Sequence, residues 1–377
     1  MRKTFKYRLY PSPAQARALD AQLKEARTLY NAALQERRDA WRRGVSLNYY
    51  DQANQLKEIR AAGDLSLANF SACQDVLRRV DKTFKAFYRR VKRGEKAGYP
   101  RFKPRQRFDS FTFPAYGDGC GLSGRRVRVQ GVGLIKVKLH RAVRGVVKTV
   151  TLKREAGYWY ACFSVECGLA LLSESRDAIG IDVGLESFAA LSNGAAIPNP
   201  RHYGEGLSDL RVAQRKVARR KKGGRGRRKT VLLLQKAHMH IRNQRSDFHH
   251  KLARQLVNRY GLIALEDLNV KGLAGGMLAK SVHDAGWASF AQKLSYKAEE
   301  TGRKLVFVNP NGTSQRCVCG AAVPKALKDR WHHCRACGLS VPRDQASAME
   351  ILRLGWSLAG ITWPGEACVP AEAVCFS

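Results

Sequence analysis

Four cysteines in the C-terminal part of the chain have the spacing of a metal site. They form two pairs, each followed by a glycine: Cys317 with Cys319, and Cys334 with Cys337. Four thiolates on two turns are the tetrahedral ligand set of a closed, structural Zn²⁺ site, which leaves no position for a substrate. The first pair has only one intervening residue, so His332 or His333 is an alternative ligand. The spacing as a whole predicts a zinc ribbon.

Three acidic residues lie where a fold could gather their carboxylates. Asp182 and Glu266 each end a buried, strand-like segment, and Asp344 begins the last helical segment. If the two strands are adjacent and parallel, their carboxyl ends meet at the edge of the sheet where α/β active sites form. Two Mg²⁺ or Mn²⁺ ions about 3.5–4 Å apart would relieve the repulsion there and support phosphodiester hydrolysis. Taken singly, each residue is more typical of a structural strand end or helix start.

A run of positive charge is the third chemical feature. Between Arg211 and Arg254 the chain has sixteen Lys or Arg residues and one acid, Asp247. Glycines interrupt this run at 218–229, so that part cannot be one continuous helix. A solvated charge run is the simpler interpretation, but no acidic segment balances these charges, and a phosphate-binding loop is therefore predicted. Its expected contacts are Arg219, Arg220, Lys221, Lys222 and Arg225.

The overall composition points to a nucleic-acid partner. A formal net charge of +37 arises from 68 Lys and Arg residues against 31 Asp and Glu residues. The 377 residues, 44% of them hydrophobic, suffice for two or three folded domains. No apolar run approaches the roughly 18 residues of a membrane span, and no signal-peptide core or lipidation motif is visible. Since the other six cysteines lack a disulfide-like spacing, we expect a cytoplasmic protein that acts at the nucleoid.

The N-terminal part is predicted to combine one antiparallel sheet with a helical insertion. Residues 4–10 alternate in polarity like a strand, and helical periodicity follows to Trp41 and again over 49–61 and 69–93. Four further alternating segments lie at 125–130, 133–139, 147–153 and 158–166. Together with the first strand they could close an antiparallel barrel.

The C-terminal part alternates strands with helices, which indicates an α/β sheet domain. The strand-like segments are 178–193, 262–268 and 304–310, and the helical segments are 207–260 and 343–354. The predicted fold class is therefore multidomain α+β, with the three acids on the second sheet domain and the cysteine ribbon inserted into it.

In this order, the motifs resemble the TnpB family, the RNA-guided nucleases of prokaryotic insertion sequences that are related to type V CRISPR effectors. GIDVGLESFAALSNG (180–194), IALEDLNVKGL (263–273) and RDQASAMEIL (343–352) are similar to the three RuvC motifs of the family. The resemblance implies that Asp182, Glu266 and Asp344 are catalytic and bind Mg²⁺. TSQRCVCG…CRACG (313–338) is similar to the family's ribbon. The third motif departs from the usual Asp-Arg-Asp-x-Asn-Ala, because Pro342 and Ala346 replace its first Asp and its Asn.

The resemblance also implies a domain order. An antiparallel wedge barrel with an inserted helical recognition domain precedes an RNase H-like RuvC domain that contains the ribbon. The implied ranges are 1–14 and 98–176 for the wedge barrel, 15–97 for the recognition domain, 177–312 and 341–356 for RuvC, 313–340 for the ribbon, and 357–377 for a disordered tail.

The implied function is RNA-guided cleavage of double-stranded DNA by an insertion-sequence protein. A guide RNA from the transposon end would pair with the target strand, while the protein reads a short transposon-adjacent motif and one RuvC site cuts both strands. One protein is expected per RNA. Further contacts are expected at Asn69, Phe70, Gln74, Ser110 and Thr112, for which helix packing and an ordinary strand are the simpler interpretations.

Three other functions are compatible with parts of the sequence. A nuclease-inactive, RNA-guided DNA-binding repressor is the main alternative, and the presence of all three acids argues against it. A junction resolvase that works without RNA would leave the helical insertion and the excess charge unexplained. A direct transposase is disfavoured, because no Tyr or Ser nucleophile context for strand transfer is visible.

Overall fold

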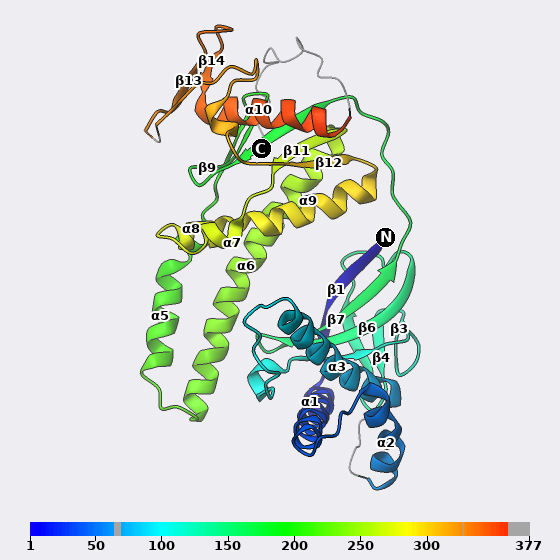
Figure 1. Cartoon of the computed structure of the whole chain (residues 1–377). Helices are drawn as coiled ribbons and strands as arrows, with labels where there is room; N and C mark the ends of the chain where they lie inside the picture. Colours follow the sequence, from blue (N-terminus) through cyan, green and yellow to red (C-terminus); the bar gives the residue numbers. More distant parts are fainter. Residues whose placement is uncertain (64–68, 327, 361–377) are drawn as a thin grey trace. The chain divides into compact units, whose positions relative to one another are not determined.

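The computed structural model describes residues 1–63, 69–326 and 328–360, and the chain divides into two compact units (Figure 1). The first unit is Met1–Gly168, and the second begins at Leu169. Both units mix helices and strands, as the sequence predicts. The tail predicted at 357–377 lies outside the described residues from position 361 onward, and the residues before it continue a helix as far as Leu358.

The first unit is an antiparallel sheet with three helices inserted after its first strand. The helices are α1 (Pro13–Arg42), α2 (Tyr49–Ala61) and α3 (Phe70–Lys92), and a short 3₁₀ helix, η1, spans Arg105–Arg107. The strands are β1 (Arg2–Tyr10), β2 (Ser110–Phe113), β3 (Cys120–Ser123), β4 (Arg126–Val129), β5 (Gly133–Lys138), β6 (Val146–Glu155) and β7 (Tyr158–Glu166). A capping box begins α1, because Ser12 and Gln15 each accept a hydrogen bond from the backbone of the other.

The seven strands are hydrogen-bonded in the order β2-β6-β7-β1-β5-β4-β3. Within the described residues the two end strands, β2 and β3, do not pair with each other, so the predicted barrel is a half-barrel. Each end strand has only four residues; a strand at β2 was expected only as the simpler interpretation of Ser110 and Thr112, and β3 was not predicted from the sequence. The apolar face of the sheet is covered by helices instead of by a closing strand pair.

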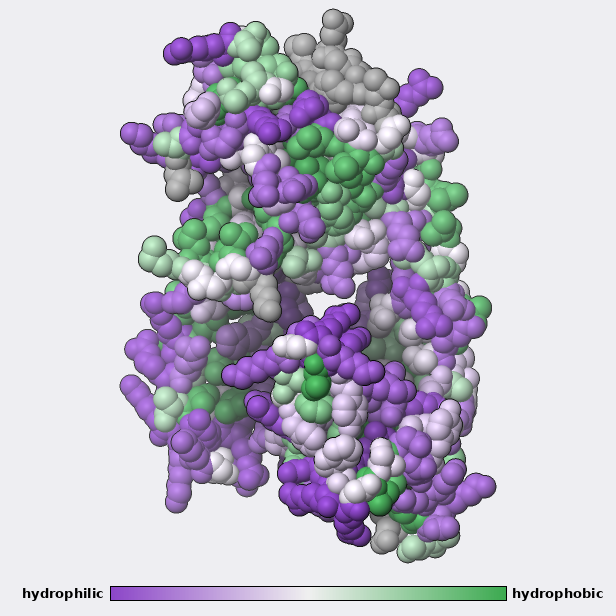
Figure 2. Space-filling view, viewed as in Figure 1, coloured by the Kyte–Doolittle hydropathy of each residue, from purple (hydrophilic) through white to green (hydrophobic). Residues whose placement is uncertain are grey.

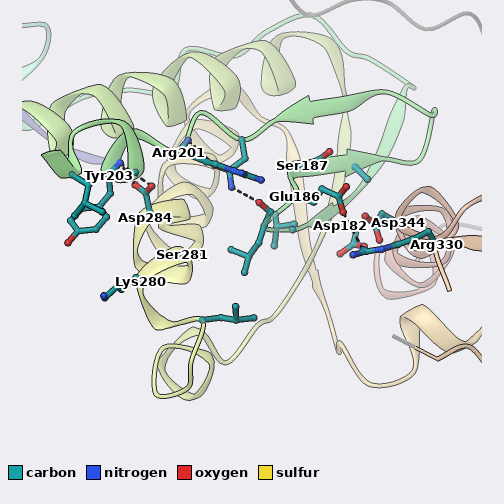
Figure 3. A pocket seen from close by; sticks show the side chains of 18 residues that line it. Asp182, Glu186, Ser187, Arg201, Tyr203, Lys280, Ser281, Asp284, Arg330 and Asp344 are labelled. Atoms are coloured by element: carbon teal, nitrogen blue, oxygen red, sulfur yellow. Dashed lines mark hydrogen bonds and ion pairs between the residues drawn. The ribbon is translucent and has the colours of Figure 1, made fainter. Parts of the chain in front are cut away.

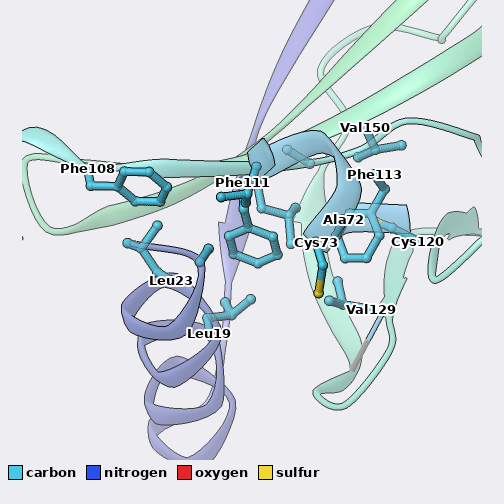
Figure 4. Close-up of a cluster of buried hydrophobic side chains, with 14 of the residues drawn as sticks. Leu19, Leu23, Ala72, Cys73, Phe108, Phe111, Phe113, Cys120, Val129 and Val150 are labelled. Atoms are coloured by element: carbon cyan, nitrogen blue, oxygen red, sulfur yellow. The ribbon is translucent and has the colours of Figure 1, made fainter. Parts of the chain in front are cut away.

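Apolar side chains of α1, α3 and the sheet form one core (Figure 4). Leu19 and Leu23 of α1 and Cys73 of α3 belong to the same cluster as Phe111 and Phe113 of β2, and each is 4% exposed or less. Burial of a side chain as large as Leu or Phe contributes roughly 1.5–3 kcal/mol. The inserted helices therefore belong to the same folding unit as the sheet.

The second unit contains a mixed five-stranded sheet, seven α-helices and a small hairpin among its described residues. The strands are β8 (Ala178–Val183), β9 (Ser187–Leu191), β10 (Ala196–Pro198), β11 (Leu262–Glu266), β12 (Lys304–Val308), β13 (Trp331–His333) and β14 (Ser340–Pro342). The helices are α4 (His202–Glu205), α5 (Leu207–Ala218), α6 (Arg225–Arg259), α7 (Val270–Leu273), α8 (Ala279–Ala285), α9 (Trp287–Thr301) and α10 (Arg343–Leu358), with a 3₁₀ turn, η2, at Thr313–Gln315. Helices α4, α7, α8 and α9 were not predicted from the sequence.

Helices cover both faces of the five-stranded sheet, whose order is β10-β9-β8-β11-β12. Strands β8, β11 and β12 are parallel. Ile181 of β8 and Leu265 of β11 pack in one cluster with side chains of α6 and α9, whereas Ala264 packs with Ile351 of α10. Because side chains alternate along a strand, the residues next to Ile181 and Leu265 face α10.

Two glycine residues let α10 lie close to this sheet. A Cβ atom built at Gly180 of β8 would lie 2.0 Å from the backbone oxygen of Ala348, and one built at Gly355 of α10 would lie 2.4 Å from the Ala264 Cβ. Neither position can therefore hold a larger residue without moving the helix. This close packing fixes the start of α10 above the carboxyl ends of β8 and β11.

Helices α5 and α6 form a hairpin whose turn carries the predicted basic cluster. The Arg227 guanidinium joins the two helices through a 2.6 Å hydrogen bond to the backbone oxygen of Val217. All five predicted contact residues in the turn are exposed: Arg219, Arg220, Lys221, Lys222 and Arg225. Figure 2 shows mostly hydrophilic side chains over this hairpin. No helix in the described part of the chain is both long and apolar enough to cross a membrane.

Candidate active site

Asp182 and Glu266 lie on adjacent parallel strands, which is the condition for their carboxylates to meet at one edge of the sheet. Strands β8 and β11 pair in a register that sets Ile181 opposite Leu265, so the next residue of each strand is one of the two acids. Since Ile181 and Leu265 point toward α6 and α9, Asp182 and Glu266 point to the opposite face, toward α10. Both carboxylates are partly buried.

Asp344 completes the group from the first turn of α10. Figure 3 shows its side chain beside that of Asp182 in a pocket. The start of α10 is tied to the chain before β13, because the Arg343 N–H donates to the backbone oxygen of Arg330 at 2.9 Å. The three predicted acids therefore come together from β8, β11 and α10, although they are up to 162 residues apart in sequence.

The surroundings of Asp182 and Glu266 favour the protonated form of both acids when no cation is present. Burial raises the pKa of Asp182 well above its ordinary value, and the charges of Glu266 and Asp344 raise it further, while Arg343 lowers it. Burial also raises the pKa of Glu266, against a hydrogen bond from the Thr313 hydroxyl that lowers it. That hydroxyl donates to Glu266 Oε1 at 2.6 Å. Because two neighbouring carboxylates disfavour the ionised form of Asp182, a divalent cation between them would stabilise this site.

The donor set suits Mg²⁺ or a similar hard cation. Carboxylate oxygens are the protein ligands that Mg²⁺ prefers, and the ion usually keeps several waters as well. The pocket lined by Asp182 and Asp344 has a volume of about 920 Å³, which leaves room for water and substrate beside the ions. The residues present therefore fit a metal-dependent site.

We expect the metal-free protein to lose stability as pH rises above the ordinary carboxyl pKa values, 3.8 for Asp182 and 4.5 for Glu266. In that range the folded state still holds protons that the unfolded chain has released, so the free energy of unfolding falls with rising pH. Mg²⁺ would bind the ionised carboxylates, and the increase in melting temperature that it causes should therefore grow with pH. Thermal denaturation between about pH 5 and pH 8, with and without Mg²⁺, measures both effects.

The control for this measurement is the double variant Asp182→Asn and Glu266→Gln, which removes both titrating groups. Its melting temperature should respond little to Mg²⁺ at any pH. A Mg²⁺ effect of equal size at every pH in the unchanged protein would contradict the raised pKa values and the binding of the cation by these acids.

The four predicted cysteines form a second metal-competent group, in which all four sulfurs lie within 4.8 Å of one another. The Sγ atoms of Cys317 and Cys337 are 3.6 Å apart, and those of Cys319 and Cys334 are 3.7 Å apart. A tetrahedral site with Zn–S bonds of 2.3 Å places its sulfurs about 3.8 Å apart. The backbone N–H groups of Cys337 and Ala336 point at the Cys334 sulfur and lower the pKa of that thiol to about 7. The arrangement fits Zn²⁺ without rearrangement.

The two histidines of this segment are not part of the four-sulfur group. His332 is fully buried, and its Nδ1 lies 2.6 Å from the Lys325 Nζ. His333 is exposed on β13, which pairs with β14 to form the hairpin of this segment. The structure therefore favours four thiols over the alternative that a histidine replaces one of them.

Three of the predicted nucleic-acid contacts lie at the start of α3. Asn69 is 5% exposed, and its side chain accepts from the Ala72 N–H and donates to Asp118 and Gln130, so the amide is engaged inside the protein. Phe70 and Gln74 line a separate pocket of about 980 Å³ in the first unit. The basic residues that line this pocket are Lys57, Arg78, Lys82 and Lys85.

The other two predicted contacts of the first unit hold an arginine. The Arg79 guanidinium donates to the Ser110 backbone oxygen at 2.8 Å and to the Thr112 hydroxyl at 2.6 Å. Both residues are partly buried. The structure thus brings Phe70 and Gln74 to one pocket, and it places Ser110 and Thr112 on β2 against α3.

Some residues of the site were not predicted from the sequence. Thr313, which hydrogen-bonds Glu266, is buried at 4% exposure four residues before Cys317. Arg201, Lys280 and Asp284 line the same pocket as Asp182, from segments with no recognisable motif. Only the tertiary contacts reveal them, since nothing in the spacing of these residues relates them to the acids.

Three family profiles match this chain. Residues 169–276 match the IS605 OrfB family, described as "Probable transposase", and residues 287–351 match "Cas12f1-like, TNB domain". Residues 1–45 match "Helix-turn-helix domain", although the structure has one strand and one helix there, β1 and α1. The first two ranges contain the three acids and the four cysteines.

Two curated relatives align with nearly the whole chain. A protein of Streptomyces pristinaespiralis is 31% identical over 368 residues, which cover 94% of this chain and 90% of the relative. InsQ of Escherichia coli (strain K12) is 27% identical over 376 residues, which cover 94% and 92%. Both relatives have the words "RNA-guided DNA endonuclease" in their names.

Among solved structures, the chain is similar to the protein in the "Cryo-EM structure of the Cas12f1-sgRNA-target DNA complex". The TM-score is 0.58 at 15% sequence identity, and the match covers 93% of this chain and 98% of the other. At this level of identity the likeness concerns the fold alone.

Proposed function

Because the chain belongs to the TnpB family, we propose that it is an RNA-guided DNA endonuclease of an insertion-sequence transposon. The observation that carries the proposal is the meeting of Asp182, Glu266 and Asp344 on one face of the second sheet. An RNA-guided repressor without nuclease activity would have no use for three gathered carboxylates, two of which raise the pKa of Asp182. The nuclease is therefore favoured over that alternative.

Asp182, Glu266 and Asp344 would hold two Mg²⁺ ions in this enzyme. When bound, Mg²⁺ supplies the positive charge that activates a water and stabilises the leaving oxygen in phosphodiester hydrolysis. Thr313 holds one oxygen of Glu266 and thereby orients that ligand. Arg343 acts electrostatically, because its positive charge lowers the pKa of Asp182 and so favours the ionised form of that acid.

The finer architecture is part of the proposal. The half-barrel is assigned as the wedge and α1–α3 as the recognition insertion, within the ranges 1–14, 15–97 and 98–176. The five-stranded sheet is assigned as the RNase H-like RuvC domain, within 177–312 and 341–356. The four-cysteine segment at 313–340 is assigned as a zinc ribbon, supported by the sulfur spacing and by the match of 287–351 to the Cas12f1-like TNB description.

The proposed partners are a guide RNA and double-stranded DNA with an adjacent motif. The formal charge of +37 and the exposed basic turn of the α5–α6 hairpin suit the binding of two polyanions. The pocket lined by Phe70, Gln74 and four Lys or Arg residues is the proposed contact surface of the first unit. Binding should weaken steeply as salt concentration rises.

Expression of the protein together with its native flanking locus tests the function directly. We expect a discrete RNA to copurify, and the complex to cut matched DNA in Mg²⁺ but not DNA without the matching sequence. Asp182→Ala should retain the RNA and lose the cutting. A complex that binds matched DNA in a guide-dependent way but never cuts would support the repressor instead, and the absence of any discrete RNA would overturn the RNA-guided mechanism.

A further inference from the structure

The pocket that contains Asp182 and Asp344 has more charged groups than metal binding requires. Its lining includes four acids and three bases, namely Asp182, Glu186, Asp284, Asp344, Arg201, Lys280 and Arg330. Glu186 pairs with Arg330 at 3.4 Å, and Asp284 lies 4.0 Å from Arg245. The charged groups of Arg201 and Lys280 make no ion pair or hydrogen bond with any described residue. Once cations neutralise the acids of the site, these two positive charges still lack a partner.

Arg201 is also held in an unusual backbone conformation. Its φ of 46° and ψ of 41° lie in the left-handed region, where the only other described residue besides glycine is Ala156. A residue with a Cβ atom is strained there, and it stays there only when its surroundings leave no alternative. Strain of this kind is often found where a side chain must be aimed at a ligand.

Hydrogen bonds on both sides of Arg201 supply that constraint. Before it, the Asn199 side chain donates to the Leu185 backbone oxygen at 2.9 Å and accepts from the Arg201 N–H at 3.2 Å. Leu185 lies in the turn after β8, three residues beyond Asp182. After it, the Tyr203 N–H donates to both carboxylate oxygens of Asp284, at 2.9 and 3.0 Å. The position of Arg201 is thus tied to the strand that carries Asp182.

We propose that Arg201, assisted by Lys280, binds backbone phosphates of the DNA strand that enters this pocket to be cut. Figure 3 shows Asp182 and Asp344 at one end of the pocket in this view, Tyr203 and Lys280 toward the other, and Arg201 between them. A guanidinium can donate two parallel hydrogen bonds to a phosphate, and a fixed backbone reduces the entropy lost when it does so. The phosphates would supply the charge that Arg201 and Lys280 lack within the protein. This inference rests on the proposed nuclease function.

Arg201→Gly gives a sharp test, because it removes the cation and relieves the strain together. We expect the melting temperature to be equal to or above that of the unchanged protein, guide-RNA affinity to be unchanged, and the single-turnover rate of target cleavage to fall about 10- to 100-fold. Arg201→Lys should recover part of the rate, since it restores the charge. A purely structural role would produce the opposite pattern, with a lower melting temperature and no recovery by Lys.

Ala156→Gly is the matched control, because it relieves the same strain in the turn between β6 and β7, outside the second unit. It should leave the cleavage rate unchanged. If the unchanged complex cuts DNA and Arg201→Gly cuts equally fast, this inference is wrong while the nuclease function stands. If Arg201→Gly instead lowers the guide-RNA affinity by a similar factor while the loaded complex cuts normally, Arg201 binds the RNA. That outcome would also overturn the inference.

A binding measurement keeps the inference testable even if the unchanged complex does not cut. The affinity of the guide-loaded complex for an oligothymidylate is measured at several salt concentrations. Loss of one phosphate contact should make the plot of log affinity against log salt shallower by about 0.7 in Arg201→Gly. An identical slope in both proteins would overturn the inference, whereas the absence of cutting by the unchanged complex bears only on the proposed function.

Discussion

Replacement of Asp182 by Asn is expected to abolish DNA cleavage and, at the same time, to stabilise the metal-free protein. The amide keeps the shape of the carboxylate but removes the negative charge that would hold Mg²⁺, so the cleavage rate should fall by about 10³-fold or more. The same charge is unfavourable in the metal-free protein, because Asp182 is buried beside Glu266 and Asp344. Relief of about 1 kcal/mol would raise the melting temperature by about 2–4 °C.

Asp177→Asn is the matched control for this result. Asp177 directly precedes the same strand, at the end opposite Asp182, and is exposed. Its replacement removes one negative charge from the same segment and should change neither cleavage nor melting temperature. Normal cutting by Asp182→Asn would remove Asp182 from the catalytic group. A loss of guide RNA together with cutting would instead point to a damaged fold.

The second large effect is expected at the ribbon. Cys317→Ser should remove bound zinc and lower cleavage at least tenfold, although Cys317 itself is no part of the carboxylate group. Loss of a structural zinc ligand typically costs a small metal domain most of its stability. The proposed ribbon segment in turn supports Asp344, because Arg343 hydrogen-bonds through its backbone to Arg330 and through its side chain to the Ala326 oxygen.

Metal content and hydrogen exchange measure this effect. The unchanged protein should contain one zinc per chain and protect the amides of 331–342, and Cys317→Ser should lose both. Cys162→Ser is the control, since Cys162 is a free, partly buried cysteine of β7 in the first unit. A variant without zinc that cuts DNA at the normal rate would show that the ribbon is not needed to position Asp344.

The acids and cysteines could be predicted because their signals are local. The continuous apolar run of LIALE and the buried strand before Asp182 place both acids at the ends of buried strands, and the pairing of β8 with β11 confirms that these strands are neighbours. The two cysteine pairs are recognisable from spacing alone. Helix α9 could also have been predicted, since Trp287, Phe290, Leu294 and Ala298 are buried at helical spacing.

Other features depend on contacts that no short stretch of sequence encodes. The conformation of Arg201 depends on contacts of its neighbours with Leu185 and Asp284. Asp284 accepts a hydrogen bond from the Tyr203 N–H although the two residues are 81 positions apart. Thr313 lies 47 residues along the chain from Glu266. It is a functional candidate only because the fold brings its hydroxyl to that carboxylate. The half-barrel was expected as a closed barrel because alternation predicts strands but not whether end strands pair.

The wide separation of the three acids along the chain also has a consequence during translation. A ribosome that has just added Asp182 must add 162 more residues, the last of which is Asp344. At about 5–20 residues per second, this takes roughly 8–32 s. In that interval the first unit, which ends at Gly168, has already been synthesised and can fold, while the carboxylate group is still incomplete. A nascent or prematurely terminated chain could therefore engage nucleic acid through its basic surfaces before it is able to break a strand.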